Sequence, residues 1–160
     1  MNKIHPLRRK DRALNAIQAM HILEVAETGC LAMAVENRPY VIPVNYVIWN
    51  GCIYVHTAKE GKKIEWLQQN PVVCFNVHRM IGVKKADTYC GYGTFFESVN
   101  VEGHAKLVMQ HPNKREILTT LVRKYDAKAQ LPPIDHTGEN SVWLIEITID
   151  SMCGKGRYPA

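Results

Sequence analysis

The chain has 160 residues, of which 46% are hydrophobic and 22% are charged, and its formal net charge is +5. This length is sufficient for one domain with a core, and the composition is typical of a globular protein. The basic excess favours anionic ligands, but no helix-turn-helix, zinc-finger or RNP-type pattern accompanies it, so nucleic acid is not an expected partner.

The N-terminal part predicts a helical region followed by a short strand. Residues 1–10 are basic and are expected to lie on the surface. Residues 11–27 carry a broken apolar stripe typical of one or two helices, with Gly29 as the stop signal. Residues 30–35 then form a short apolar strand, and residues 36–39 form a turn into the next element.

The strongest local signal is Asn50-Gly51, which lies between two alternating apolar runs and predicts a two-residue type I′ hairpin. Strand side chains alternate between faces, so one face of this hairpin is apolar and should be the core. That face carries Ile42, Val44, Tyr46, Ile48, Ile53 and Val55. The opposite face pairs Trp49 with Cys52, Val47 with Tyr54 and Asn45 with His56, and it also carries Pro43. Proline weakens the ladder, so backbone groups near Pro43 are expected to be available to a ligand.

A helical pattern at residues 62–69 begins with Lys62 and Lys63. Lysines in the first turn of a helix oppose the macrodipole by about 0.3–1 kcal/mol each. Two explanations stay open. Either the lysines are a solvated pair, or a phosphate at the helix N-terminus is held by the N–H groups and the ammonium groups.

The second half predicts further strands and one long helix. It gives a strand at residues 72–77, an irregular segment at 79–93, a long strand at 95–109 bent at Gly103, and a helix after Pro112. A loop with Pro132-Pro133 spans residues 126–140, and a last strand spans 142–149. Tight hairpins with only two long crossovers favour a mainly β (α+β) fold, an antiparallel barrel with peripheral helices, over a doubly wound parallel sheet.

The cysteines, the histidines and the hydropathy restrict which classes of protein remain possible. The five cysteines (Cys30, Cys52, Cys74, Cys90 and Cys153) are odd in number and widely spaced, which favours free thiols in a reducing cytoplasm. The seven histidines show no metal-ligand spacing, so no metal is expected. No apolar run reaches transmembrane length and no signal-peptide pattern follows the N-terminus, so we expect a cytoplasmic protein that does not bind a membrane.

The ordered motifs resemble those of the pyridoxamine-phosphate-oxidase-like flavin-binding split barrels, in particular the nitroimidazole-resistance branch. The matching segments are PYVIPVNY (residues 39–46), IYVH (53–56), EGKKI (60–64) and NPVVC (70–74). Later matches are Cys90, Ser98-Val99, Gly103-His104-Ala105 and Gly154-Lys155. The resemblance implies that residues 1–160 form a single flavin-binding split-barrel domain.

The resemblance also implies a homodimer with FMN, or FAD, at the subunit interface. The backbone from Pro43 through Val44 and Asn45 to Tyr46 would follow the flavin ring, His56, Thr57 and Ala58 would lie near the ring and ribityl chain, and Lys62, Lys63 and Ser98 would approach the phosphate. One departure concerns the phosphate. Relatives usually carry Lys or Arg, often followed by Tyr, shortly before the serine, whereas this chain has Thr94-Phe95-Phe96-Glu97-Ser98. The paired aromatics belong either to the core or to a stack on a ring.

Function stays open between three classes at this point. The first is a flavin-dependent oxidoreductase that reduces a nitro compound or another small acceptor with electrons from a separate donor. In such an enzyme the cofactor carries the chemistry, and His56 is the candidate catalytic residue, although it is equally a candidate structural histidine. The second is a haem-binding or haem-degrading split barrel with His56, His78 and His104 as candidate ligands. The third is a flavin carrier or sensor without turnover.

Overall fold

The structure, a computed structural model, describes residues 7–132 and 134–159. Most of the predicted basic segment at residues 1–10, and Pro133 of the predicted loop, therefore lie outside the described residues. Within the described residues, no helix is long and apolar enough to cross a membrane.

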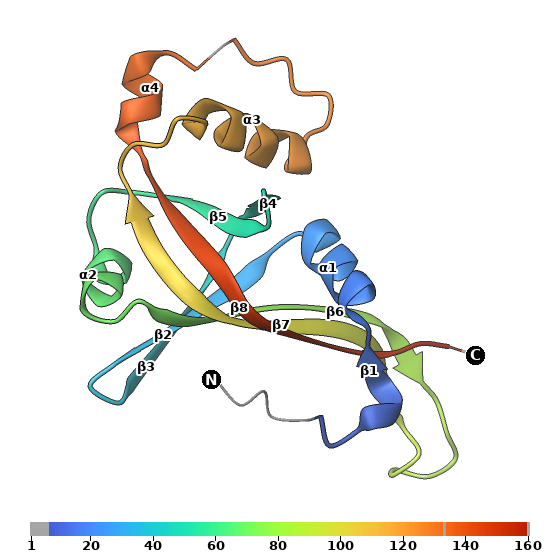
Figure 1. The fold of residues 1–160 in the computed structure, drawn as a ribbon. Helices are drawn as coiled ribbons and strands as arrows, with labels where there is room; N and C mark the ends of the chain where they lie inside the picture. The colour runs from blue at the N-terminus through green and yellow to red at the C-terminus, as the bar shows by residue number, and fades with distance from the viewer. Residues whose placement is uncertain (1–6, 133, 160) are drawn as a thin grey trace.

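One antiparallel sheet of eight strands curls around a hydrophobic core (Figure 1). Its strand order is β3-β2-β6-β7-β8-β5-β4, and β1 adds to β8. The strands are β1 (Ala13–Leu14), β2 (Gly29–Val35), β3 (Arg38–Val44), β4 (Val47–Trp49), β5 (Cys52–Thr57), β6 (Val72–Lys84), β7 (Gly93–Val108) and β8 (Trp143–Arg157). The predicted antiparallel split barrel with peripheral helices is confirmed.

The two edges of this sheet, β3 and β4, are consecutive in the sequence. Asn45 and Tyr46 carry the chain from one edge to the other, and we call these two residues the seam. The predicted pairing of Asn45 with His56 is absent from the ladder, which stops at Val47 and Tyr54. The reason is that β3 pairs with β2, through a turn in which Glu36 and Asn37 have φ of 50° and 61°.

The predicted hairpin around Asn50-Gly51 is confirmed. Trp49 pairs with Cys52 and Val47 with Tyr54, and the φ angles of 48° at Asn50 and 77° at Gly51 are those that a type I′ turn requires. The predicted core face is also confirmed, since its members either belong to the main core or pack against it. The buried members are Val44, Tyr46, Ile53 and Val55, and the partly buried ones are Ile42 and Ile48.

The N-terminal helical region is shorter than predicted. A 3-10 turn η1 (Lys10–Arg12) and β1 take up most of the segment before α1 (Ala16–Val25). A capping box between Asn15 and Gln18 starts α1. Gly29 does not end this helix, which is capped by Ala26; it opens β2, where a Cβ would lie 2.1 Å from the ring of Phe75.

Helix α2 (Lys62–Gln69) forms with the predicted bounds, and α3 (Lys114–Tyr125) forms as the predicted long helix. The predicted loop at 126–140 contains a further short helix, α4 (His136–Ser141), whose start is capped by the Asp135 carboxylate. Figure 1 shows α3 and α4 together over one end of the barrel.

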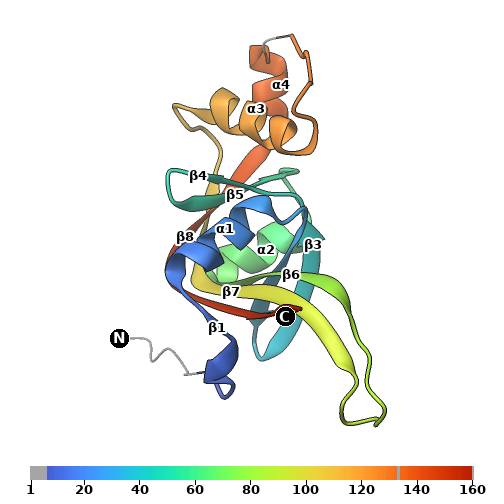
Figure 2. The same ribbon diagram turned by 90° about the vertical axis from the view of Figure 1, so that its right-hand side faces the viewer.

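The predicted irregular segment at 79–93 is confirmed at residues 85–92 and wrong at its two ends. Residues 79–84 belong to β6 and Gly93 belongs to β7, and the two strands form a ribbon that extends beyond the barrel (Figure 2), with a bulge between Met80 and Gly82. Gly82 and Gly93 are accommodated there because each pairs with a residue of the opposite strand. Strand β8 likewise runs to Arg157, beyond the predicted end at residue 149. The predicted bend at Gly103 is confirmed by a register shift between Glu102 and Gly103.

A second, smaller core lies beneath α3. It consists of Val47, Tyr54, Val108, Ile117, Leu121 and Leu144. Helix α3 therefore covers the turn end of the hairpin face that was predicted to meet a ligand. Only the far end of that face, with Pro43, Asn45 and His56, stays exposed.

Candidate functional site at the seam

A cavity of about 400 Å³ lies beside the seam. Five of the predicted site residues line it, together with Thr28 and Val55; the five are Pro43, Val44, Asn45, His56 and Lys63. They come from β3, the seam, β5 and the first turn of α2. The structure thus brings together the ligand face of the hairpin and one of the two predicted phosphate-binding lysines.

Thr28 was not predicted. It lies in the connection between α1 and β2, where no turn or motif pattern marks it. It reaches the cavity because β2 pairs with β3, so that Gly29 is opposite Val44. Only the strand order shows this, and no local sequence signal could have done so.

The two residues of the seam differ in their exposure to solvent. Asn45 is exposed at the cavity, whereas the side chain of Tyr46 is fully buried and its hydroxyl donates to the carbonyl of Leu23. The backbone N–H of Tyr46 donates to the hydroxyl of Tyr125 at 3.1 Å. The amide of Tyr46 is therefore already satisfied, and Asn45 is the seam residue that a ligand can meet.

The electrostatics of the cavity favour an anion. Lys63 is half-buried, burial lowers the pKa of its ammonium group, and none of the ion pairs within residues 7–132 and 134–159 involves it. The pKa of His56 is also lowered, first by partial burial of its ring and then by the nearby charge of Lys63. An anion in the cavity would relieve both effects.

The start of α2 offers backbone donors at the same place. Gly61 precedes the helix with φ of 110°, and its carbonyl accepts the first helical hydrogen bonds, from the N–H groups of Ile64 and Glu65. The earlier N–H groups of a helix have no partner within the helix. Lys63 belongs to this first turn, and a cation together with free helix N–H groups suits a phosphate.

Lys62 takes a different position from Lys63. Its ammonium group lies 4.3 Å from the centre of the Tyr40 ring and 4.6 Å from that of Trp66. These cation–π contacts hold it on the outer side of α2. Thr57, which is buried, and Ala58, which is exposed, follow His56 without lining the cavity.

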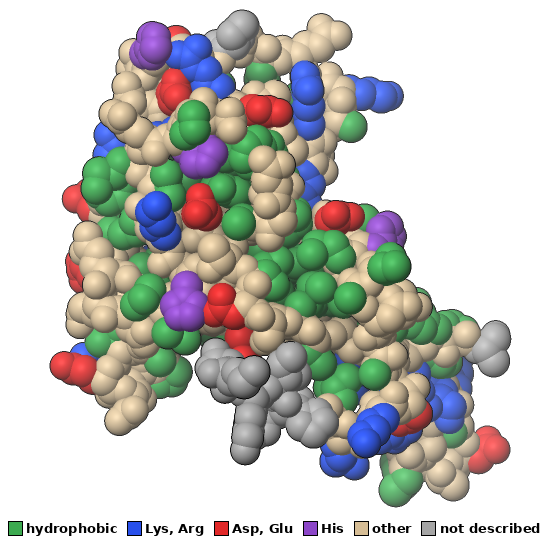
Figure 3. Space-filling model, in the orientation of Figure 1, with side chains coloured by type: hydrophobic (Ala, Val, Ile, Leu, Met, Phe, Trp, Pro, Cys, Tyr) green, Lys and Arg blue, Asp and Glu red, His purple; other side chains and the backbone are tan. Residues whose placement is uncertain are grey.

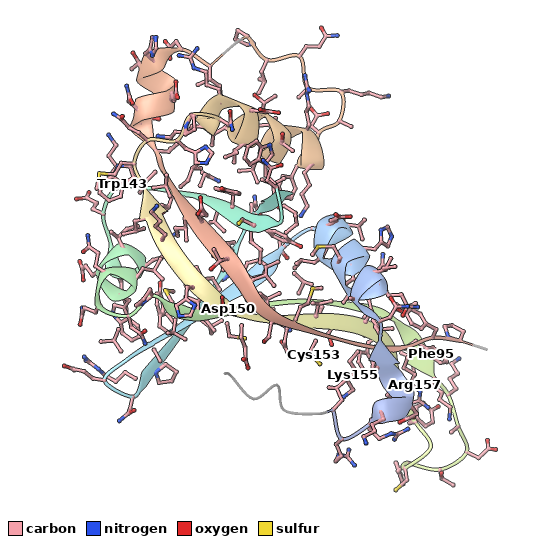
Figure 4. The ribbon with its side chains drawn as sticks, viewed as in Figure 1. Phe95, Trp143, Asp150, Cys153, Lys155 and Arg157 are labelled. Carbon is pink, nitrogen blue, oxygen red and sulfur yellow. The ribbon has the colours of Figure 1, made fainter. Side chains whose placement is uncertain are left out.

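Ser98 lies on the outward face of β7, away from the seam cavity. Its neighbours across the sheet are His78 on β6 and Lys155 on β8. The ammonium group of Lys155 lies 5.6 Å from the centre of the Phe96 ring, and the guanidinium of Arg157 lies 5.9 Å from that of Phe95. Figure 4 shows Phe95, Lys155 and Arg157 at the same end of the sheet. The two phenylalanines are half-buried, and each lies near a cation. Thr94–Glu97 lack the Lys or Arg that relatives carry before the serine, but β8 places Lys155 and Arg157 beside this segment.

The three candidate haem ligands are not gathered in one place. His56 is at the seam, and His78 and His104 lie on β6 and β7, where their partners across the sheet are Ser98 and Val72. His104 is paired with Asp150.

Comparisons with known proteins identify the family and the fold. The family model described as pyridoxamine 5′-phosphate oxidase matches residues 16–155. A protein from Bacteroides thetaiotaomicron, provisionally described as a 5-nitroimidazole antibiotic resistance protein, is 28% identical with a TM-score of 0.76, over 89% of this chain and 85% of that one. No curated protein matches the chain significantly.

Two further solved structures share the fold at lower identity. The flavocytochrome Anf3 of Azotobacter vinelandii is 19% identical with a TM-score of 0.85, over 99% of this chain and 75% of that one. An FAD-binding protein from Mesorhizobium loti is 23% identical with a TM-score of 0.68, over 92% of this chain and 98% of that one.

Proposed function

The chain belongs to the pyridoxamine 5′-phosphate oxidase family, and we propose that it binds a flavin at the seam cavity and acts as an oxidoreductase. The observation that carries the proposal is the meeting of Asn45, His56 and Lys63 with the first turn of α2 around one cavity. A half-buried cation, helix N–H groups and an exposed seam amide form the donor set that a phosphate joined to a polar ring system needs.

The residues have separate parts in this proposal. Lys63 and the first N–H groups of α2 hold the phosphate. Lys62, whose ammonium group lies over the rings of Tyr40 and Trp66, has the smaller part in binding it. Pro43, Val44 and Asn45 follow the ring, and His56 lies beside it. A bound flavin supplies the electron transfer, while these side chains orient it. FMN is the flavin we propose, with FAD as the larger alternative, and the acceptor is a nitro compound or another small molecule.

We further propose a homodimer in the cytoplasm, formed through the outward face of the sheet. That face leaves Val41 and Val72 exposed by 59% and 53%, and a cavity of about 330 Å³ there is lined mainly by β2 and β6. Exposed apolar surface of this kind marks an interface, and two-fold pairing is the commonest arrangement. Ser98 lies on the same face, and its proposed contact with the flavin phosphate depends on this dimer.

Absorbance and mass spectrometry of the cofactor released from the purified protein test the proposal. Flavin absorbance with the mass of FMN or FAD is expected. Colourless protein that takes up neither added flavin would overturn it, and a Soret band would indicate haem. Turnover with a reduced nicotinamide and a nitro compound would separate an enzyme from a carrier. Light scattering that gives the mass of one chain for the flavin-bound protein would contradict the dimer.

A further inference from the structure

A second cavity, of about 760 Å³, lies where β7 ends and α3 and α4 meet. None of its lining residues lines the seam cavity. Its polar lining comes from Gln110, His111, Lys114, Arg115, His136, Glu139 and Asn140. Figure 3 shows histidine, basic and acidic side chains gathered over this end of the molecule, where Figure 1 places α3 and α4. The volume is that of a small-molecule site, which is about 300–1,000 Å³, and exceeds the volume of a bare ion.

The most unusual member of this lining is Lys114. It is 1% exposed, and its ammonium group donates to the carbonyls of Met109 at 2.9 Å and Val142 at 2.7 Å. An ammonium group has three donors, so one is left. In the part of the chain that the structure describes, no carboxylate forms an ion pair with Lys114. A buried charge is costly unless an opposite charge compensates it, and two carbonyl dipoles compensate it only in part.

Glu139, the acidic residue of the lining, compensates that charge only in part. Its negative charge favours the ammonium form of Lys114, but its carboxylate is already bound by Arg115, with Nε at 2.6 Å. Nη2 of Arg115 also lies 3.1 Å from Nδ1 of His136. Lys114 and Arg115 carry two positive charges and Glu139 carries one negative charge. The lining therefore has a net charge of +1 when both imidazoles are neutral.

We propose that this cavity binds a small organic molecule through its phosphate group. The guanidinium of Arg115 and the imidazoles of His111 and His136 offer more donors than a carboxylate uses, and a phosphate has three acceptor oxygens. The buried ammonium group of Lys114 adds positive charge behind them. The carbon part of the ligand occupies the remaining volume, against Met109 and Pro112. This site is separate from the proposed flavin site and does not depend on flavin binding.

Calorimetric titration of the purified protein, saturated with FMN if it takes up flavin, tests this site with ribose 5-phosphate and with inorganic phosphate. Wild type is expected to bind ribose 5-phosphate more tightly than inorganic phosphate. Arg115→Gln should weaken binding at least tenfold. Lys128→Gln, at an exposed lysine that lines neither cavity, is the control and should leave binding unchanged.

Two further measurements keep the proposal falsifiable if Arg115→Gln disturbs α4. Glu139→Gln removes the competing carboxylate and should tighten phosphate binding severalfold, which a purely structural crevice would not show. In NMR spectra the imidazole signals of His111 and His136 should shift with added phosphate, while exposed His21 should not. Absence of heat and of these shifts at millimolar ligand would overturn the proposal, as would equal affinity in wild type and Glu139→Gln.

Discussion

The hydroxyl of Tyr125, at the C-terminal end of α3, accepts a hydrogen bond from the backbone N–H of Tyr46 at 3.1 Å across 79 residues of sequence. The same hydroxyl donates to the carbonyl of Glu27 at 2.7 Å. Since the seam has no ladder partner on this side, a side chain from the peripheral helix takes the place of a neighbouring strand. Helix α3 thereby fixes the backbone next to Asn45, which faces the proposed flavin.

Tyr125→Phe should lower the free energy of unfolding by about 1–2 kcal/mol, because the N–H of Tyr46 loses its partner while the ring stays. It should also weaken flavin binding, since Asn45 is no longer held. Chemical denaturation and a flavin titration measure the two effects. Tyr89→Phe is the control, since Tyr89 is 100% exposed. Wild-type stability in Tyr125→Phe would show that the seam is held by packing alone.

Lys63→Ala should weaken FMN far more than riboflavin, which has no phosphate. The loss of one charge-assisted contact is worth about 1.5–3 kcal/mol, or roughly tenfold to a hundredfold in affinity. Lys62→Ala should have the smaller effect, because its ammonium group stacks on Tyr40 and Trp66. Fluorescence titrations with both ligands measure this. If both flavins weaken equally in Lys63→Ala, the lysine supports the ring pocket or the fold instead.

His56→Ala should leave the melting temperature of the flavin-free protein nearly unchanged. His56 is exposed, and within the described residues its side chain makes no hydrogen bond that the substitution would break. Flavin affinity or the rate of flavin reduction should fall at least about tenfold, equivalent to roughly 1.4 kcal/mol. His21→Ala, on the exposed face of α1, is the control. A drop of several degrees with normal flavin binding would make His56 a framework residue.

Stability should rise between about pH 8 and 9.5 because of Lys124. Its Nζ lies 3.5 Å from the centre of the Tyr46 ring and has no hydrogen-bond partner among the described residues, and burial lowers its pKa from 10.5 to about 8. In this range Lys124 binds more protons in the unfolded chain than in the folded one, so its contribution to the free energy of unfolding increases with pH. The thiols of Cys52 and Cys74, whose pKa values burial raises, oppose the rise toward its upper end. The window ends near pH 10, where tyrosines of the unfolded chain ionise before Tyr46, whose pKa burial raises.

Lys124→Met should flatten that rise, and denaturation curves at several pH values measure it. Lys128→Met, at an exposed lysine, should retain the rise. An unchanged slope in Lys124→Met would assign the effect to other groups, first to Lys63, whose pKa burial also lowers.

Gly103→Ala should destabilise the protein by about 3 kcal/mol, because a Cβ there would lie 2.0 Å from the carbonyl oxygen of Thr148. The Cα of Gly103 and the carbonyl of Thr148 both belong to the backbone of the paired strands β7 and β8, so neither can move away without disturbing the ladder. Gly82→Ala is the matched control in a long strand, with its nearest neighbour 3.9 Å away. Thermal unfolding of both variants compares them. Equal stability would mean that the bend between Glu102 and Gly103 relaxes without cost.

Local signals predicted the elements that depend on neighbouring residues. The turn at Asn50-Gly51 needs positive φ at both positions, and these two residue types supply it. The bounds of α2 follow from Gly61 before it and Asn70-Pro71 after it. The core face of the hairpin follows from alternation, which is the same whichever strand lies alongside.

The choice of neighbouring strand is what the sequence did not specify. Strand β3 has the same alternation whether it pairs with β2 or β5, so the seam and the approach of Thr28 depend on the assembled sheet. The hydrogen bond between Tyr125 and Tyr46 joins residues 79 apart in the sequence, so no local pattern predicts it either. Helix α4 was missed because glycine and proline dominate its surroundings, although Asp135 before Gly138 is a capping signal.

Strand β8, the last strand in the sequence, lies between β7 and β5. Until it has left the ribosome, those two strands have no neighbour on that side, and the halves of the sheet that they carry cannot join. The two halves therefore join only after residues 144–147, which pair with both β5 and β7, have been synthesised, and the nascent chain meanwhile exposes two strand edges to other chains. Its yield in a cell should thus depend on chaperones that cover those edges during translation, rather than on the stability of the finished fold.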